Sequence, residues 1–420
     1  MPFFDLLTRQ QNTRGSWGCQ RTRVARRLPA LVLLAAVGAA SCGSPPEPRD
    51  PTATAAAELR GQAREALDRG DARLAVATFR RALQLAPSDA DTWNDLGLAY
   101  QVAGDLDSAQ ASFESAIRLA PRRAPAHLNL AVLLMRRGVS GRARTEFAQA
   151  LELDPGNPSP YWNFATALLD VGKTEPAREL LDTALQLDPA CGPAEATYGR
   201  LEALNGQPAL AIPHFERAES LGVQGATLQA NLGLALLQVG RAAEAEVRLD
   251  RAVALDSTSA SAWNHLGLAR LGTGKVAEAI EALERARRLA PRDEDLRFNL
   301  GSALLRLERY AEAVALLERP RPERADLLAL AAMALRGAGR RGDALLFAKD
   351  AAARAPRDVV ILNNYGVLLA ETGDVESALD VWRQVLEVDP GNTTARDNLK
   401  ARGGVAPQSE EAGGGSKPRP

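Results

Sequence analysis

The chain has 420 residues, with 51 Lys and Arg against 52 Asp and Glu, and its formal net charge is −1. This balance gives no overall basic field to attract nucleic acid, and an aromatic content of 5% is too low for a base-stacking surface. The three cysteines, Cys19, Cys42 and Cys191, form no CxxC or other metal-binding spacing. Composition therefore predicts no nucleic-acid partner and no metal site.

The N-terminal segment has the layout of a bacterial export signal. Basic residues that end at Arg27 precede an apolar run from Leu28 to Ala40, which is short for a membrane span and fits the hydrophobic core of a signal peptide. The sequence Ala39-Ala40-Ser41-Cys42-Gly43 resembles the lipobox of bacterial lipoproteins, although Leu is more common where Ala39 stands. The resemblance implies a signal peptide over residues 1–41, cleavage before Cys42 and acylation of Cys42.

Two other interpretations of this segment stay open: a secretory signal cleaved near Ala40, and an uncleaved anchor. Residues 42–55 contain several prolines and are predicted to form a flexible tether after the acylated cysteine. Gly43 and Ser44 follow the cysteine where an Asp would be a retention signal in enteric bacteria. By that resemblance we expect a periplasm-facing protein that is lipid-anchored in the cell envelope, with the outer membrane favoured over the inner.

From residue 56 to 392 the sequence repeats a 34-residue pattern, with the eighth repeat three residues shorter than the others. The ten repeats start at Ala56, Ala90, Ala124, Pro158, Gly192, Ala226, Ala260, Glu294, Ala325 and Val359. Within each repeat, position 8 is Gly or Ala, position 20 is Ala, and position 24 is large and apolar in all but one. Position 15 is Gly in nine repeats and position 32 is Pro in seven. Because Gly suits a helix C-cap and Pro ends a helix, each repeat is predicted to be helix, tight turn, helix, turn.

This pattern resembles the tetratricopeptide repeat (TPR) family. The resemblance implies an all-α solenoid over residues 56–392, in which about ten helix-turn-helix repeats form a right-handed superhelix and the first helices line a concave groove. Residues 393–402 are predicted to form a capping helix and residues 403–420 a disordered tail. The fifth repeat ends in Leu221-Gly222 without the usual Pro. In the shortened eighth repeat, Pro320 predicts a truncated second helix and a break in regular stacking.

The predicted groove is rich in carboxamides at positions 5 and 6 of the first helices. The candidate binding residues are Asn94, Asn129, Asn163, Asn231, Asn264, His265, Asn299, Asn363 and Asn364. Such a ladder can pair with the backbone of an extended peptide without reading its side chains, and it is similar to the asparagine ladder of TPR superhelices that hold extended polypeptides. The alternative is that Asn is simply the common residue at position 6 in this family.

Enzyme signatures are weak. The three histidines have no metal-ligand spacing, and His127 stands at position 4, where an aromatic residue usually packs. The stretch from Gly272 to Lys275 lacks the leading Gly and the final Ser or Thr of a phosphate-binding loop. We therefore expect no catalytic residues and no cofactor.

The sequence as a whole predicts a non-enzymatic scaffold that binds protein or peptide partners in its groove and reaches the membrane through its N-terminal lipid. By family resemblance, such a scaffold would support assembly of an envelope, pilus or secretion complex. The alternative is an adaptor subunit of an envelope enzyme complex, such as a hydrolase, a protease or a polysaccharide export system.

Overall fold

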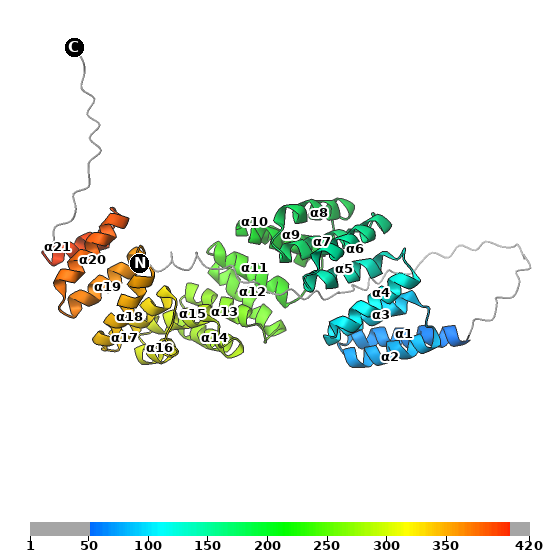
Figure 1. Ribbon diagram of the computed structural model, residues 1–420, viewed down its shortest axis with the longest axis horizontal. Helices are drawn as coiled ribbons and strands as arrows, with labels where there is room; N and C mark the ends of the chain where they lie inside the picture. Colours follow the sequence, from blue (N-terminus) through cyan, green and yellow to red (C-terminus); the bar gives the residue numbers. More distant parts are fainter. Residues whose placement is uncertain (1–50, 404–420) are drawn as a thin grey trace, which may run out of the picture. The chain divides into compact units, whose positions relative to one another are not determined.

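The computed structural model describes residues 51–403, and all of their regular secondary structure is helical (Figure 1). The predicted signal peptide, Cys42 and most of the tail lie outside the described residues, and the predicted tether lies outside them up to residue 50. The chain divides into two compact units between Gln224 and Gly225, here called the N-terminal half and the C-terminal half.

Each repeat is a pair of antiparallel helices. The N-terminal half contains α1 (Pro51–Asp68), α2 (Ala72–Leu85), α3 (Ala90–Ala103), α4 (Leu106–Leu119), α5 (Ala124–Arg136), α6 (Ser140–Leu153), α7 (Pro158–Asp170), α8 (Thr174–Leu187), α9 (Gly192–Leu204) and α10 (Pro208–Ser220). The C-terminal half contains α11 (Ala226–Gln238), α12 (Ala242–Leu255), α13 (Ala260–Gly272), α14 (Val276–Leu289), α15 (Glu294–Arg306), α16 (Tyr310–Leu317), α17 (Ala325–Gly337), α18 (Arg341–Arg354), α19 (Val359–Glu371), α20 (Val375–Val388) and α21 (Thr393–Ala401). From α3 onward, every first helix begins at the predicted start of its repeat.

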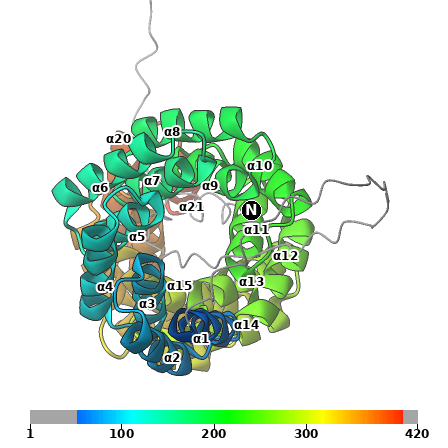
Figure 2. The same ribbon diagram turned by 90° about the vertical axis from the view of Figure 1, so that its right-hand side faces the viewer.

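The helix pairs stack so that each half has two layers. Within each half, a first helix touches the first helix of the next repeat, and each second helix packs against the first helix that follows it. Figure 2 shows this layering in the N-terminal half, where α5, α7 and α9 lie on the inner side of the curve and α6, α8 and α10 on the outer side. The inner layer therefore exposes a row of first helices along one side of each half.

Two sequence positions build the core between the layers. The alanines at position 20 are completely buried in all ten repeats, and the large residues at position 24 are buried against them. Position 8 is small because the helices approach closely: a Cβ atom on Gly97 would lie 2.5 Å from the ring of Phe113, and one on Gly366 would lie 2.5 Å from the indole of Trp382.

The ends of the array are polar. On α1, positions 3, 7 and 10 are Glu58, Gln62 and Glu65, which are exposed, whereas the same positions of the later first helices are mostly apolar and buried. At the other end, α21 buries Ala395 and Leu399 against the preceding helices and leaves charged residues in water. A polar outer face at both ends is what an array of stacked repeats needs for solubility.

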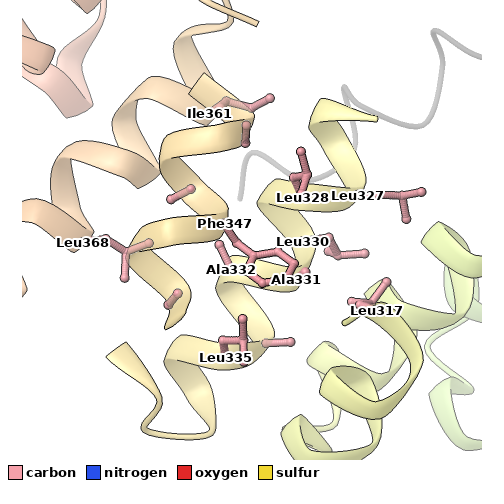
Figure 3. Close-up of a cluster of buried hydrophobic side chains, with 14 of the residues drawn as sticks. Leu317, Leu327, Leu328, Leu330, Ala331, Ala332, Leu335, Phe347, Ile361 and Leu368 are labelled. Carbon is pink, nitrogen blue, oxygen red and sulfur yellow. The ribbon is translucent and has the colours of Figure 1, made fainter. Parts of the chain in front are cut away.

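The eighth repeat is shortened without an interruption of the core. Its second helix, α16, has only 8 residues, as the sequence predicts. Nevertheless Leu317 from α16 and Leu330 from α17 both lie 3.0 Å from the Cβ position of Gly301, and one buried cluster contains residues from Leu271 to Leu399. Figure 3 shows the part of this cluster in which Leu317, Leu330 and Phe347 lie. The predicted break in stacking near Pro320 is therefore not found in the core, and the chain divides instead after the fifth repeat, at Gln224.

An arginine on α15 binds the carbonyl groups at the end of the truncated helix α16. Arg297 occupies position 4 of α15, and its Nε donates to the carbonyl oxygen of Leu316 at 2.9 Å. Its Nη2 donates to the carbonyls of Leu317 and Pro320 at 2.7 and 2.5 Å. A helix end leaves its last carbonyls without intrahelical partners, so this guanidinium replaces the turn that the deletion removes.

Candidate binding surface

The candidate site is the exposed row of first helices in each half, which we call the first-helix face. It consists of positions 2, 5, 6, 9, 12 and 13 of each first helix. The structure places all nine predicted binding residues on these helices, at the expected positions. Asn129, Asn264, Asn299 and Asn363 are buried, and the other five are half-buried.

The amides pair between repeats, which the sequence analysis did not anticipate. Asn129 Nδ2 donates to Asn94 Oδ1 at 2.8 Å, and Asn299 Nδ2 donates to Asn264 Oδ1 at 2.9 Å. In both pairs a position-5 amide accepts from a position-6 amide 35 residues later. Each pair uses one donor and one acceptor of its two carboxamides, so these residues hold neighbouring first helices together as well as lining the face.

In the N-terminal half several other polar side chains of the face also have partners within the protein. Asn163 Nδ2 donates to the carbonyl oxygen of Ser159 at 2.8 Å, one turn earlier in α7. The hydroxyls of Thr166 and Thr197 lie 3.2 Å apart, across the gap between α7 and α9. Arg200, which is buried on α9, forms an ion pair with Asp170 on α7.

A cluster of charges at the start of this half is also neutralised internally. The carboxylate of Asp95 on α3 is buried and accepts from Arg60 Nε at 2.9 Å and Arg64 Nε at 2.7 Å, both on α1. Asp91, one turn earlier on α3, pairs with Arg123. These ion pairs join one repeat to the next, and the carboxylates already have cationic partners.

The C-terminal half has a different face. No Asp, Glu, Lys or Arg occurs at positions 5, 6 and 9 of its first helices, which are α11, α13, α15, α17 and α19. Charges occur at the margins, where Arg324 pairs with Asp295 at 2.7 Å and Arg336 pairs with Glu371 at 2.8 Å. The centre of this face is therefore uncharged and is bordered by ion pairs.

His265 lies in this uncharged centre, on α13. Some surface of the residue remains exposed, but its Nδ1 is enclosed by protein and has no hydrogen-bond partner among the described residues. Burial lowers the pKa of His265 from 6.5 to about 4, because the charged imidazolium would lose its hydration. The imidazole is therefore neutral at physiological pH and adds no charge to the face.

His127 and the Gly272–Lys275 turn, which the sequence analysis weighed as sites of metal or phosphate binding, make hydrogen bonds and ion pairs within the protein. His127 is buried, as expected for position 4, and its two ring nitrogens lie 2.6 Å from Glu146 Oε2 and 2.9 Å from the carbonyl oxygen of Pro121. In the Gly272–Lys275 turn, Lys275 Nζ lies 2.8 Å from Glu246 Oε1 and Thr273 donates to the same carboxylate at 3.1 Å. That turn thus binds a carboxylate of the preceding repeat.

Three further features bear on metal binding, thiol chemistry and membrane insertion in the part of the chain that the structure describes. Within residues 51–403, no three His, Cys, Asp or Glu side chains lie together as a metal site. Cys191 is buried, and burial raises the pKa of its thiol above the ordinary value, which disfavours a reactive thiolate. Over the same range, no helix combines the length and apolar character needed to cross a membrane.

Sequence-family models identify the repeats. Two models, both described as Tetratricopeptide repeat, match the chain. One matches residues 60–102, 94–158, 230–294, 266–325 and 330–393, and the other matches residues 140–201. Together the matches cover well over half of the sequence. No curated protein matches this chain.

Three solved structures illustrate what this chain is similar to. YrrB, described as a TPR protein with an unusual peptide-binding site, is 25% identical over 48% of this chain and 97% of its own, with a TM-score of 0.38. The pilF protein of Pseudomonas aeruginosa is 23% identical over 52% of this chain and 98% of its own, with a TM-score of 0.44. A TPR protein from Parabacteroides merdae is 17% identical over 60% of this chain and 99% of its own, with a TM-score of 0.44.

Proposed function

Because this chain belongs to the tetratricopeptide repeat family, we propose that it is a non-catalytic scaffold that binds polypeptide partners on its first-helix face. The observation that carries the proposal is the composition of that face: carboxamide, hydroxyl and half-buried apolar side chains lie in a row along adjacent first helices. Carboxamides can serve both the donors and the acceptors of a peptide backbone, and the apolar side chains between them can bury those of a partner.

The first-helix face can be tested by site-specific photo-crosslinking in the native cell. A photoreactive amino acid would replace Leu268, which is half-buried on α13, and as a matched control Glu281, which is exposed on the second helix α14 of the same repeat. We expect discrete polypeptide adducts from position 268 and none from position 281. Equal adducts from both positions, or adducts from position 281 alone, would contradict binding on the first-helix face.

We also propose that the protein is anchored in the bacterial envelope by a lipid on Cys42, with the outer membrane favoured, and that it supports assembly of an envelope, pilus or secretion complex. The support is the basic cluster, the short apolar run and the small residues before Cys42. Metabolic labelling with a palmitate analogue should mark the wild-type chain, and Cys42→Ala should abolish the label and release the protein from the membrane fraction. A cleaved but unlabelled wild-type chain would instead indicate a secretory signal.

A further inference from the structure

The two halves differ in how their first-helix faces use polar groups. Three enclosed polar atoms on successive first helices of the C-terminal half have no hydrogen-bond partner among the described residues: Asn231 Nδ2 on α11, His265 Nδ1 on α13 and Ser302 Oγ on α15. In the N-terminal half the uncharged polar side chains at the same positions 5, 6 and 9 are all bonded, as Asn94–Asn129, Asn163–Ser159 and Thr166–Thr197 show.

Unpaired polar atoms in an enclosed site carry a free-energy penalty that a ligand can remove. A buried donor or acceptor without a partner has lost its bonds to water. Because α11 touches α13 and α13 touches α15, the three side chains stand on neighbouring helices, at positions 6, 6 and 9. A peptide backbone laid across these helices presents N–H and C=O groups at regular intervals, and small rotations of the three side chains would let them bond to it.

The apolar side chains around these polar groups indicate what the ligand's side chains are like. The half-buried apolar residues at positions 5 and 9 are Ala230, Leu234, Leu268, Phe298, Ala329, Met333 and Val367. With no charge at positions 5, 6 or 9 and a neutral His265, the centre offers no counter-charge to a Lys, Arg, Asp or Glu of a ligand. Burying such a side chain without a partner is costly, whereas apolar and small polar side chains lose little.

The geometry points to the C-terminal first-helix face, from α11 to α19, as the principal peptide-binding part of the molecule, and we propose that it takes an extended segment whose side chains carry no charge. This inference rests on the proposed function and narrows it to one half and one class of ligand. Five first helices at spacings of roughly 9 Å span about 36 Å, which corresponds to a segment of about 11 extended residues.

The test is a fluorescence-anisotropy titration of the full chain in detergent with three labelled 12-residue peptides whose ends are blocked. One peptide contains only Leu, Val, Ala and Ser, and in the other two a pair of central Ser residues is replaced by Glu or by Lys. We expect the neutral peptide to bind at least ~10-fold more tightly than either charged peptide. A charged peptide that binds as tightly as the neutral one, or a neutral peptide that does not bind, would overturn the proposal.

Matched variants locate the binding. Leu268→Glu on α13 and Val132→Glu on α5 change half-buried residues at position 9 in the two halves. We expect Leu268→Glu to weaken binding of the neutral peptide by ~10-fold or more and Val132→Glu to change it by less than ~2-fold. The opposite order, or an equal loss in both, would place the site elsewhere.

A second variant keeps the proposal testable if Leu268→Glu fails to fold. Asn231→Leu removes an unpartnered donor while nearly preserving volume, so the thermal transition should stay constant or rise while affinity for the neutral peptide falls. Unchanged affinity would refute a role for this amide. If crosslinks form at position 268 but the charged peptides bind best, only this inference fails, whereas absence of adducts both at position 268 and at the matching position 132 of α5 counts against the proposed function itself.

Discussion

The contacts of Arg297 predict that this one side chain stabilises the shortened eighth repeat. Replacement by Leu is the informative change, because Leu328 and Leu362 occupy the same position 4 in the next two repeats and show that Leu suits the helix. The variant removes three hydrogen bonds to the carbonyls of Leu316, Leu317 and Pro320, with donor–acceptor distances of 2.9, 2.7 and 2.5 Å.

The size of the effect follows from the kind of bond that is lost. Hydrogen bonds from a charged donor contribute about 1.5–3 kcal/mol each, and a cation at a helix C-terminus adds about 0.3–1 kcal/mol. Because Arg297 is only half-buried, water can replace part of the loss when the carbonyls become free. We therefore expect Arg297→Leu to lower the free energy of unfolding of the C-terminal half by about 2–3 kcal/mol. Arg297→Lys should lower it by less, because an ammonium group keeps a charged donor, although it cannot span all three carbonyls.

The loss of stability can be measured by urea unfolding, followed by tryptophan fluorescence, and by amide hydrogen exchange over α15 to α17. Arg306→Leu is the control, since Arg306 is exposed on the same helix. Exchange should accelerate first in α16. If Arg297→Leu and Arg306→Leu unfold at the same urea concentration and α16 keeps its protection, the interpretation of Arg297 as a helix cap is wrong.

Two further predictions concern the same half. Burial lowers the pKa of His265 from 6.5 to about 4, so this imidazole takes up a proton more readily in the unfolded chain than in the folded one. The free energy of unfolding is therefore highest above pH 6.5 and falls toward pH 4, by about 2 kcal/mol at pH 5. His265→Gln should remove this fall, which urea titrations at pH 7.5 and pH 5 would measure. Glu308 has φ of 55° at position 15, where the other nine repeats have Gly. Because a left-handed conformation costs an L-residue about 1–2 kcal/mol, Glu308→Gly should raise the urea midpoint. A lowered midpoint would show that Glu308 is not strained at this position.

The repeat architecture could be predicted from the sequence because residues within each repeat mark where its helices begin, pack and end. Position 20 is Ala and completely buried in every repeat, and position 8 is small because a Cβ atom there, as on Gly97, would collide with the large residue at position 24. The turn residues were equally informative: Gly104, for example, adopts φ of 85° at the end of α3. These features depend on residues within one repeat, so periodicity alone reveals them.

What the sequence could not supply depends on side chains that meet across repeats or at irregular turns. The role of Arg297 follows from where the shortened α16 ends, which a deletion of three residues does not specify. The sequence also did not show which of its irregular repeats would interrupt the stacking, and we predicted the break near Pro320. Pro320 suggested a break, but Leu317 and Leu330 continue the core past it, whereas Gly222 and Gly225 both have positive φ close to the actual division at Gln224.

The asparagines show why the same residue type can bind a partner in one repeat and a neighbouring repeat in another. An amide at position 6 is occupied when position 5 of the preceding repeat is also Asn, as in Asn94–Asn129 and Asn264–Asn299. Asn364 instead has Ala329 at the corresponding place, 35 residues earlier, which offers no side-chain acceptor. A position-6 asparagine is thus available to a ligand when its predecessor at position 5 offers no acceptor and its own helix does not bond it, as the Ser159 carbonyl bonds Asn163. These local partners, rather than the number of asparagines, therefore decide which parts of the first-helix face can bond to a peptide backbone.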